Sequence, residues 1–205
     1  MTGSIVHVVD DDEDARRGMA RLLEAAGFEP RTYPTGSAFL DALDTESPGC
    51  IILDLRLPDR NGLELQAALA KQVSLPIIFV TGYGEIPDTV RAIKDGAVDF
   101  LTKPVDGNTL LAAVGRALAQ DASARAARVR RDSLRRRFDR LTPREREVFA
   151  HLISGQLNKQ IAGDLQITER TIKMYRASIL AKLEANSIAE LARLAVDLGI
   201  EPSRS

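Results

Sequence analysis

The chain has 205 residues, of which 44% are hydrophobic and 28% are charged. This length fits one large domain or two ordinary ones, and the composition excludes collagen-like, disulfide-scaffold and wholly disordered classes. The single cysteine, Cys50, cannot form an internal disulfide, and no apolar run reaches the ~18 residues that a membrane span needs. We therefore expect a cytoplasmic protein without a membrane segment.

The net charge of −1 conceals an uneven distribution of charged side chains. Residues 1–116 carry 11 basic and 18 acidic side chains, a net charge of −7. Residues 117–137 carry 7 and 2, a net charge of +5, and residues 138–205 carry 10 and 9, a net charge of +1. An acidic first half joined to a basic connector indicates two parts with different partners.

Short aliphatic runs alternate with amphipathic stretches in the first half of the chain. Strands are expected at 5–9, 28–33, 50–53, 77–80 and 99–101, and helices near 13–26, 35–44, 61–71, 86–95 and from 107 onward. The first, third and fourth strands are almost continuously aliphatic, which suits a parallel sheet covered on both faces. The alternation predicts an α/β domain built on a doubly wound, five-stranded parallel sheet.

The last part of the chain carries the signals of short helices. Thr142-Pro-Arg-Glu145 and Ser187-Ile-Ala-Glu190 are both capping-box sequences. Between them, residues 158–165 and 168–183 are predicted to form a short helix, a tight turn and a longer helix. Four helices in roughly 60 residues predict an all-α helix-turn-helix domain.

The connector between these parts is rich in alanine and arginine and lacks proline and glycine, so it favours a helix. Two interpretations of it stay open: a solvated linker, or a coiled-coil-like helix that holds two chains together. We accordingly divide the chain into a domain at 1–119, a helical linker at 120–138 and a second domain at 139–205.

Reactive side chains follow four of the predicted strands. Asp10 and Asp11 come after the first, Asp54 after the third, Thr81 at the end of the fourth and Lys103 after the fifth. Ligands of open α/β sheets bind at these carboxyl ends. Three acids brought together repel one another and need a counter-charge, and all-oxygen ligands suit Mg²⁺. Such an ion can clamp a phosphoryl group in line with a carboxylate nucleophile.

These motifs carry a resemblance to a known family. Val-Val-Asp-Asp-Asp at 8–12, Ile-Leu-Asp-Leu-Arg-Leu-Pro-Asp-Arg-Asn-Gly at 52–62, Val-Thr-Gly at 80–82 and Lys103-Pro104 resemble the receiver domain of bacterial two-component response regulators. That domain has a flavodoxin-like fold, and the likeness extends over residues 4–119.

The resemblance implies a role for each matching position. Asp54 is expected to accept a phosphoryl group from a sensor histidine kinase. Mg²⁺ is expected to bind Asp10, Asp11, Asp54 and the main-chain carbonyl of Arg56. Thr81 and Lys103 are expected to sense the phosphate. Phe100 occupies the aromatic switch position, where it lacks the hydroxyl of the tyrosine that many receivers have and can respond only by changing rotamer.

A second resemblance covers the C-terminal part. Leu-Thr-Pro-Arg-Glu-Arg-Glu-Val at 141–148, Asn-Lys-Gln-Ile-Ala at 158–162, Thr-Ile-Lys at 171–173 and Lys182-Leu183 resemble the LuxR-type DNA-binding module. The order of the two halves resembles the FixJ and NarL branch. Thr-Gly-Tyr-Gly at 81–84 and Gly-Ala-Val-Asp-Phe-Leu at 96–101 favour FixJ-like regulators. The resemblance implies a transcription regulator that binds double-stranded DNA and forms a homodimer when phosphorylated, with RNA polymerase as a further partner.

The helix after Thr168 has two distinct faces. At about 100° per residue, the buried stripe contains Ile172, Ile179, Leu180 and Leu183, and the opposite face contains Arg170, Lys173, Met174, Ala177, Ser178 and Ala181. We predict that Lys173, Met174 and Ala177 face base edges. Phosphate contacts are predicted for Asn158, Lys159, Arg170 and Thr171. Arg176 lies beside the buried stripe, where a packing or phosphate role is expected.

A net charge of +1 on the second domain favours two copies side by side on DNA. The resemblance places the receiver's dimer surface on the fourth helix and fifth strand, where it includes Val90, Arg91, Lys94 and Val98.

Two other functions are weighed against this one. The first is an aspartate-nucleophile phosphohydrolase of similar fold, which typically has a second acid two residues after the nucleophile; Arg56 at that position counts against turnover. The second is a receiver whose C-terminal domain binds protein or RNA. We expect a regulator that is not an enzyme beyond its own phosphorylation and dephosphorylation at Asp54.

Overall fold

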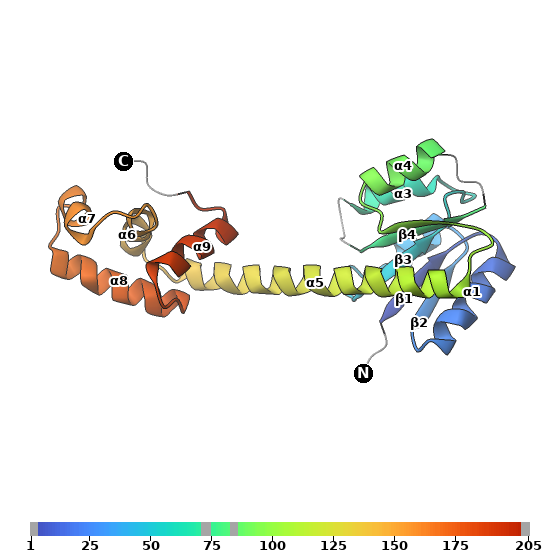
Figure 1. The fold of residues 1–205 in the computed structure, drawn as a ribbon, viewed down its shortest axis with the longest axis horizontal. Coiled ribbons are helices and arrows are strands. Elements are labelled where there is room, and N and C mark those ends of the chain that lie inside the picture. Colours follow the sequence, from blue (N-terminus) through green and yellow to red (C-terminus); the bar gives the residue numbers. More distant parts are fainter. Residues whose placement is uncertain (1–3, 71–74, 83–85, 202–205) are drawn as a thin grey trace. The chain divides into compact units, whose positions relative to one another are not determined.

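The computed structural model describes residues 4–70, 75–82 and 86–201 (Figure 1). The chain divides into two compact units, Met1–Arg125 and Ala126–Ser205, and the division falls inside the long helix α5 (Gly107–Asp139). The domain boundaries predicted at residues 119 and 139 stay predictions. Helix α5 runs across the first of them without interruption and ends at the second. None of the helices within the described ranges is both long and apolar enough to cross a membrane.

The first unit is built on one parallel sheet, as the alternation of strands and helices predicted. Its strands are β1 (Ile5–Val9), β2 (Glu29–Tyr33), β3 (Gly49–Leu53), β4 (Ile77–Thr81) and β5 (Asp99–Thr102), in the spatial order β2-β1-β3-β4-β5. Its other helices are α1 (Glu13–Ala25), α2 (Gly36–Ala42), α3 (Gly62–Leu69) and α4 (Ile86–Lys94). The predicted fold class, a doubly wound five-stranded sheet, is confirmed.

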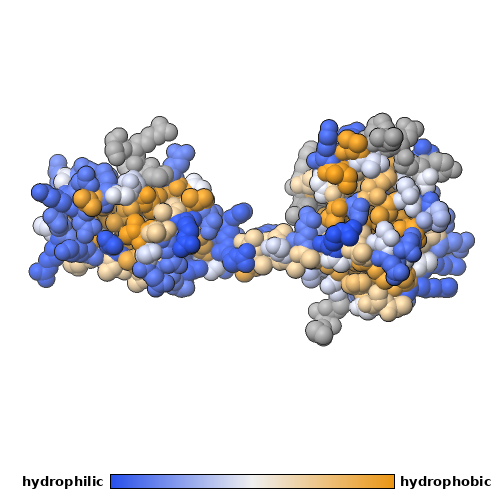
Figure 2. All heavy atoms as spheres, in the orientation of Figure 1, coloured by the Kyte–Doolittle hydropathy of each residue, from blue (hydrophilic) through white to orange (hydrophobic). Residues whose placement is uncertain are grey.

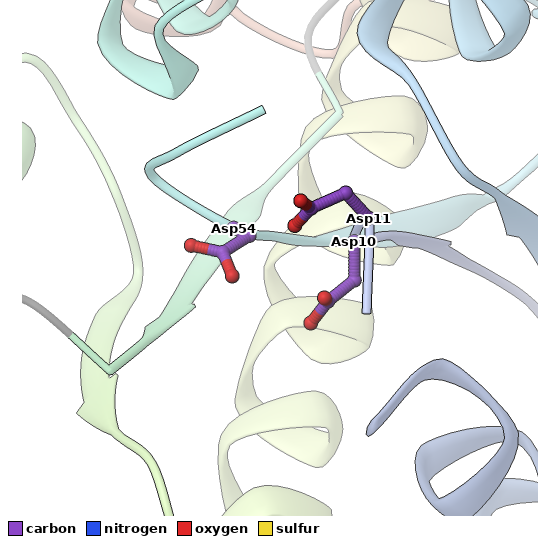
Figure 3. Close-up of side chains that lie close together, drawn as sticks. All are labelled: Asp10, Asp11 and Asp54. Carbon is purple, nitrogen blue, oxygen red and sulfur yellow. The ribbon is translucent and has the colours of Figure 1, made fainter. Parts of the chain in front are cut away.

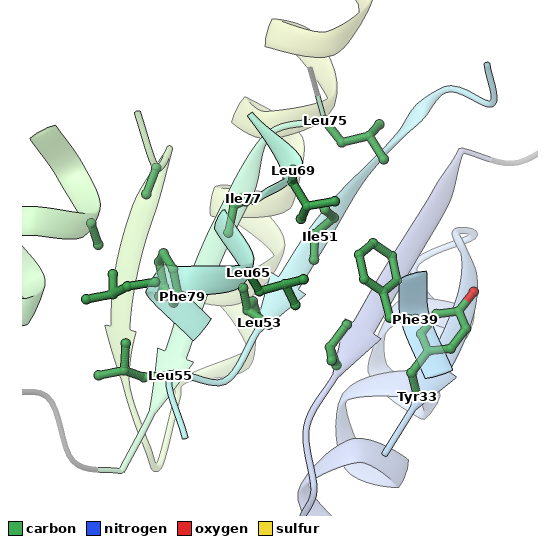
Figure 4. Close-up of a cluster of buried hydrophobic side chains, with 14 residues drawn as sticks. Tyr33, Phe39, Ile51, Leu53, Leu55, Leu65, Leu69, Leu75, Ile77 and Phe79 are labelled. Atoms are coloured by element: carbon green, nitrogen blue, oxygen red, sulfur yellow. The ribbon is translucent and has the colours of Figure 1, made fainter. Parts of the chain in front are cut away.

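Helices cover both faces of this sheet, because successive side chains of a strand point to opposite sides. Val8 and Ile52 pack with Leu23 of α1 and Val114 of α5 on one face. The other face packs against α2, α3 and α4 through residues that include Phe39, Leu53, Leu65, Phe79 and Ala92 (Figure 4). Every residue of β1, β3 and β4 is buried, as their aliphatic runs predicted.

The second unit contains a helical domain that joins the end of α5. Its helices are α6 (Pro143–Ile153), α7 (Asn158–Asp164), α8 (Glu169–Leu183) and α9 (Ile188–Leu198). Residues 165–168 connect α7 to α8, which gives the predicted helix-turn-helix arrangement. Phe138, near the end of α5, lies edge-on to Phe149 of α6 with ring centroids 5.4 Å apart. The last turn of α5 therefore belongs to this core.

One buried carboxylate fixes α8 against α6. Thr142 and Glu145 form the predicted capping box at the start of α6. Glu145 also accepts hydrogen bonds from Ser178 Oγ at 2.7 Å and from Lys182 Nζ at 2.7 and 2.8 Å. The prediction that Ser178 lies on the exposed face of α8 is thus wrong, because its hydroxyl turns toward this carboxylate.

The second capping box differs from its prediction at one bond. Ser187 Oγ accepts from the amide of Glu190, as a cap requires, at 3.2 Å. The Glu190 carboxylate, however, accepts from the amide of Asn186 at 2.8 Å, one residue before the cap.

Glu145 also makes the second unit sensitive to acid. Burial raises the pKa of its carboxyl, but hydrogen bonds from Lys182, Ser178 and Thr142 outweigh this effect and lower the pKa to about 2. A carboxyl whose pKa is lower in the folded state stabilises that state above its unfolded pKa. This contribution is lost as the pH falls from about 4.5 toward 2.

We predict that Glu145→Gln lowers the free energy of opening of α8 by about 1.5–3 kcal/mol at neutral pH, because Lys182 loses its buried counter-charge. The difference from the wild type should shrink as the pH falls toward 2, where Glu145 itself becomes neutral. Hydrogen exchange of α8 amides in the full chain measures both effects. Glu147→Gln, on the same helix and 52% exposed, is the matched control and should change little. An equal loss in both variants would contradict the assignment.

Candidate functional site

Three carboxylates meet at the carboxyl edge of the sheet. Strands β1 and β3 pair in register with Val9 beside Leu53, so the residues that follow them also lie side by side. One oxygen from each of Asp10, Asp11 and Asp54 lies within 4.8 Å of the others (Figure 3). Asp10 and Asp54 are buried, with 1% and 7% of their surface exposed, whereas Asp11 is exposed. The cluster of carboxylates is therefore open to solvent on the side where Asp11 lies.

Lys103 supplies the positive charge at this cluster. Its Nζ lies 2.6 Å from Asp10 Oδ2 and 2.6 Å from Asp54 Oδ2. Burial raises the pKa of Asp10, and the lowering effect of Lys103 does not cancel this. Burial lowers the pKa of Lys103, but the two carboxylates outweigh burial and raise it. The ammonium group is therefore held in its charged form between the two acids. The Lys103–Pro104 peptide bond is cis.

The donor set fits a hard divalent cation. Asp10 Oδ2 lies 2.6 Å from Lys103 Nζ and has no other polar partner among the residues that the structure describes. Asp54 Oδ1 accepts one bond, from the amide of Arg56 at 3.1 Å. One ammonium balances only one of three carboxylates, and the remaining ligand atoms are all oxygens, the ligands that Mg²⁺ prefers. The acidic cluster can thus accept Mg²⁺ both by charge and by chemistry.

Thr81 and Lys103 adjoin each other across two strands. Thr81 is buried at the end of β4, opposite Thr102 of β5, and its carbonyl accepts from the amide of Lys103 at 2.9 Å. Phe100 is partly buried two residues before Thr102, and its ring centroid lies 6.0 Å from that of Phe79. The backbone of β5 therefore links the predicted switch positions to the lysine at the carboxylates.

The loop after Asp54 contains two features that the sequence did not single out. A Cβ on Gly62 would lie 2.6 Å from the Asp54 carbonyl oxygen, so α3 can begin this close behind the acid only with glycine there. Asp59 accepts hydrogen bonds from the amides of Gly36 and Ser37, at 3.1 and 2.8 Å, and ties the loop to the start of α2. The Asn-Gly dipeptide is a recognisable turn signal. No local sequence pattern indicated the contact of Asp59, because its partners are 22 and 23 residues away in the chain.

On α8, the residues predicted to face base edges lie on the exposed face. Lys173, Met174 and Ala177 are exposed, and Met174 retains 67% of its surface. Arg176 is half-buried. Leu157, at the N-cap of α7, is 70% exposed and was not predicted. Both helices of the motif therefore present apolar as well as basic side chains to solvent.

The four residues predicted to contact phosphates are placed differently from one another. Arg170 on α8 and Lys159 on α7 are exposed. Asn158 is the first residue of α7 and is half-buried. Thr171 is also half-buried, and its hydroxyl lies 2.8 Å from that of the N-cap residue Thr168. The Thr171 hydroxyl is thus already engaged at the start of α8.

The predicted dimer residues lie only partly on one surface. Val90, Arg91 and Lys94 are exposed on α4, and hydrophobic side chains reach the molecular surface there (Figure 2). Val98 instead is partly buried against the core on the α1 and α5 side of the sheet. Ile93 was not predicted, although it is 46% exposed like Val90 three residues earlier.

Two known families account for most of the chain. Residues 6–115 match the family described as response regulator receiver domain. Residues 139–195 match the family described as bacterial regulatory proteins, luxR family. Tyr83 and Gly84, which the sequence offered as part of a FixJ-like motif, lie outside the described residues.

Full-length relatives have the same order of domains. The chain is 41% identical to the transcriptional regulatory protein FixJ of Bradyrhizobium diazoefficiens over 95% of its own length and 96% of that protein. It is 40% identical to nodulation protein W of the same organism, over 100% of its length and 90% of that protein. The solved structure of response regulator StyR is 44% identical, with a TM-score of 0.83 over 95% of this chain and 98% of that one.

These matches confirm the predicted resemblance to FixJ-like regulators. They place a DNA-binding module, not a catalytic domain, after the receiver. The chain therefore belongs to the response regulators of two-component systems, transcription regulators that join a receiver domain to a LuxR-type DNA-binding domain.

Proposed function

We propose that this regulator is switched in the cytoplasm by phosphorylation of Asp54 by a sensor histidine kinase. The observation that carries the proposal is the cluster of Asp10, Asp11 and Asp54 with Lys103 Nζ 2.6 Å from two of them. In this proposal residues 1–119 receive the signal, residues 120–138 link the domains and residues 139–205 bind DNA.

We infer that Asp10, Asp11, Asp54 and the main-chain carbonyl of Arg56 hold Mg²⁺. When bound, the ion neutralises phosphoryl oxygens so that an anionic nucleophile can approach them. Asp54 is the carboxylate best placed to act as this nucleophile, because it lies between Lys103 and the backbone of its own loop.

The proposed transfer is a simple displacement. An oxygen of Asp54 attacks the phosphorus of the donor phosphohistidine, the P–N bond breaks and its electron pair stays on the imidazole. The product carries about −1.5 to −2 charges and additional acceptor oxygens. Lys103 then pairs with these oxygens, the Thr81 hydroxyl donates to one of them, and Phe100 changes rotamer as the end of β4 shifts.

The arrangement does not favour sustained phosphatase turnover. Two residues after Asp54, where a general acid would be needed, the side chain is the exposed arginine Arg56. Hydrolysis of the aspartyl phosphate therefore serves to reset the switch.

We predict that the full chain gains one phosphoryl group when it is treated with acetyl phosphate and Mg²⁺, as measured by intact mass. Asp54→Asn should gain none, whereas Asp14→Asn, at an exposed acid of α1, should behave like the wild type. Chelation of Mg²⁺ should prevent the reaction in the wild type and in Asp14→Asn. Equal phosphorylation of Asp54→Asn would contradict the assignment.

Dimerisation through α4 is the proposed consequence of phosphorylation. We predict that acetyl phosphate doubles the mass of the wild type in light scattering and that Val90→Asp weakens this dimer at least about tenfold, because a buried carboxylate is costly. Val129→Asp tests the rival coiled coil at a 65% exposed position of α5. Loss of the dimer in Val129→Asp but not in Val90→Asp would place the interface on the linker.

The DNA-contacting roles on α8 predict two different phenotypes. Lys173→Ala should change the base preferred at one position of duplexes selected from a random pool, because it removes a base contact. Arg170→Ala should keep the selected sequence and weaken binding to all duplexes, because it removes a phosphate contact. Failure of the wild type to bind any duplex in a salt-dependent way would favour a domain that binds protein or RNA. RNA polymerase is the further partner that we propose for the DNA-bound dimer.

A further inference from the structure

One side of α5 carries arginines and no acid. At about 100° per residue, Arg130 and Arg136 of α5 and Arg140, the residue just after it, lie within an arc of ~120° that contains no carboxylate. We call these three residues the arginine stripe. All three are exposed, and none forms an ion pair within the part of the chain that the structure describes. The stripe belongs to the unit Ala126–Ser205.

The remaining circumference of α5 is accounted for by other contacts. Leu134 and Phe138 are buried on the side that joins the helical domain. A third side of α5 carries both acids and bases, namely Asp132, Asp139, Arg131 and Arg135. On this side Arg135 Nε lies 3.7 Å from Asp139 Oδ1. Neither packing nor pairing along the helix therefore explains the stripe.

Arg137 connects the stripe to α8. Its Nη1 donates to the Leu183 carbonyl at 3.2 Å and to Glu184 Oε2 at 2.9 Å, at the C-terminal end of α8, where a positive charge is favourable. Glu184 is the C-cap residue that ends α8, so Arg137 joins the end of α5 to the C-terminal end of α8. Arg136 and Arg140 lie within three residues of Arg137 in the sequence, and Arg130 lies ~10 Å farther along α5 than Arg137.

Most of the positive charge of this unit lies on α5. Residues 126–205 contain 16 basic and 10 acidic side chains, a net charge of +6, and residues 126–139 alone contain 6 and 2, a net charge of +4. DNA presents one negative charge per ~1.7 Å of its axis and binds such cations without regard to sequence. Arginine also binds phosphate with a planar pair of donors.

We propose that the arginine stripe is a second DNA-contact surface, which binds backbone phosphates flanking the segment that α8 enters. The inference rests on the proposed function, because α8 must dock first to bring α5 to the duplex. The stripe adds affinity without reading bases, and Arg130 and Arg136 supplement the net charge of only +1 on residues 138–205, which already includes Arg140.

The test compares two double variants of the full chain that remove the same charge from neighbouring positions. Arg130→Gln with Arg136→Gln removes two stripe residues, and Arg131→Gln with Arg135→Gln is the matched control on another side of α5. Binding to a mixed-sequence duplex of about 30 base pairs is measured by fluorescence anisotropy over a range of KCl concentrations. We expect the slope of log K against log salt to be smaller by about 2 in the stripe variant and unchanged in the control.

Each other outcome has a distinct meaning. Equal slopes in wild type and stripe variant, or equal reductions in both variants, overturn the inference while leaving the proposed function intact. Tighter binding by the stripe variant also overturns it, and shows instead that an acidic protein surface covers these arginines. Absence of salt-dependent binding by the wild type means that the proposed function itself fails.

Discussion

Mutual repulsion between three carboxylates is the constraint on which the regulator depends. Parallel strands in register force Asp10 and Asp54 to the same edge of the sheet, and the next residue, Asp11, completes the cluster. Lys103 can neutralise only part of this charge. The site is therefore built with unsatisfied negative charge, and a cation or a rearrangement of the lysine relieves it. In the function proposed above, a phosphoryl group on Asp54 changes that balance, and the change reaches the rest of the receiver through Lys103 and Thr81.

The C-terminal unit depends on buried or half-buried charged groups of a different kind. Glu145 holds α8 against α6 through Lys182 and Ser178, and Arg137 holds the end of α5 against the end of α8. Both contacts fix the helix whose exposed face carries Lys173 and Met174. The end of α5 therefore meets α8 both through Arg137 and in the core cluster that contains Phe138 and Ile179.

The sequence predicted the features of the fold and the site that depend on local residue patterns and on the order of the strands. Continuous aliphatic runs identified β1, β3 and β4, and the residues just after them identified Asp10 and Asp54, because the edge of a parallel sheet follows from chain direction. Ser178 was assigned to the wrong face of α8. Helical periodicity takes no account of neighbouring elements, and the buried carboxylate of Glu145 on α6 lies beside this residue. Val98, Asp59 and Arg137 were missed or misread for the same reason, since their surroundings come from segments distant in the chain.

Calorimetric titration of the full chain with Mg²⁺ tests the central claim most directly. If the three carboxylates create the demand for a cation, the wild type and Asp14→Asn bind one Mg²⁺ each with equal affinity, and Asp11→Asn, which removes the exposed member of the cluster, binds it much more weakly. Equal Mg²⁺ affinity in all three proteins would contradict this account, because the acids at the sheet edge would then have no part in recruiting the ion.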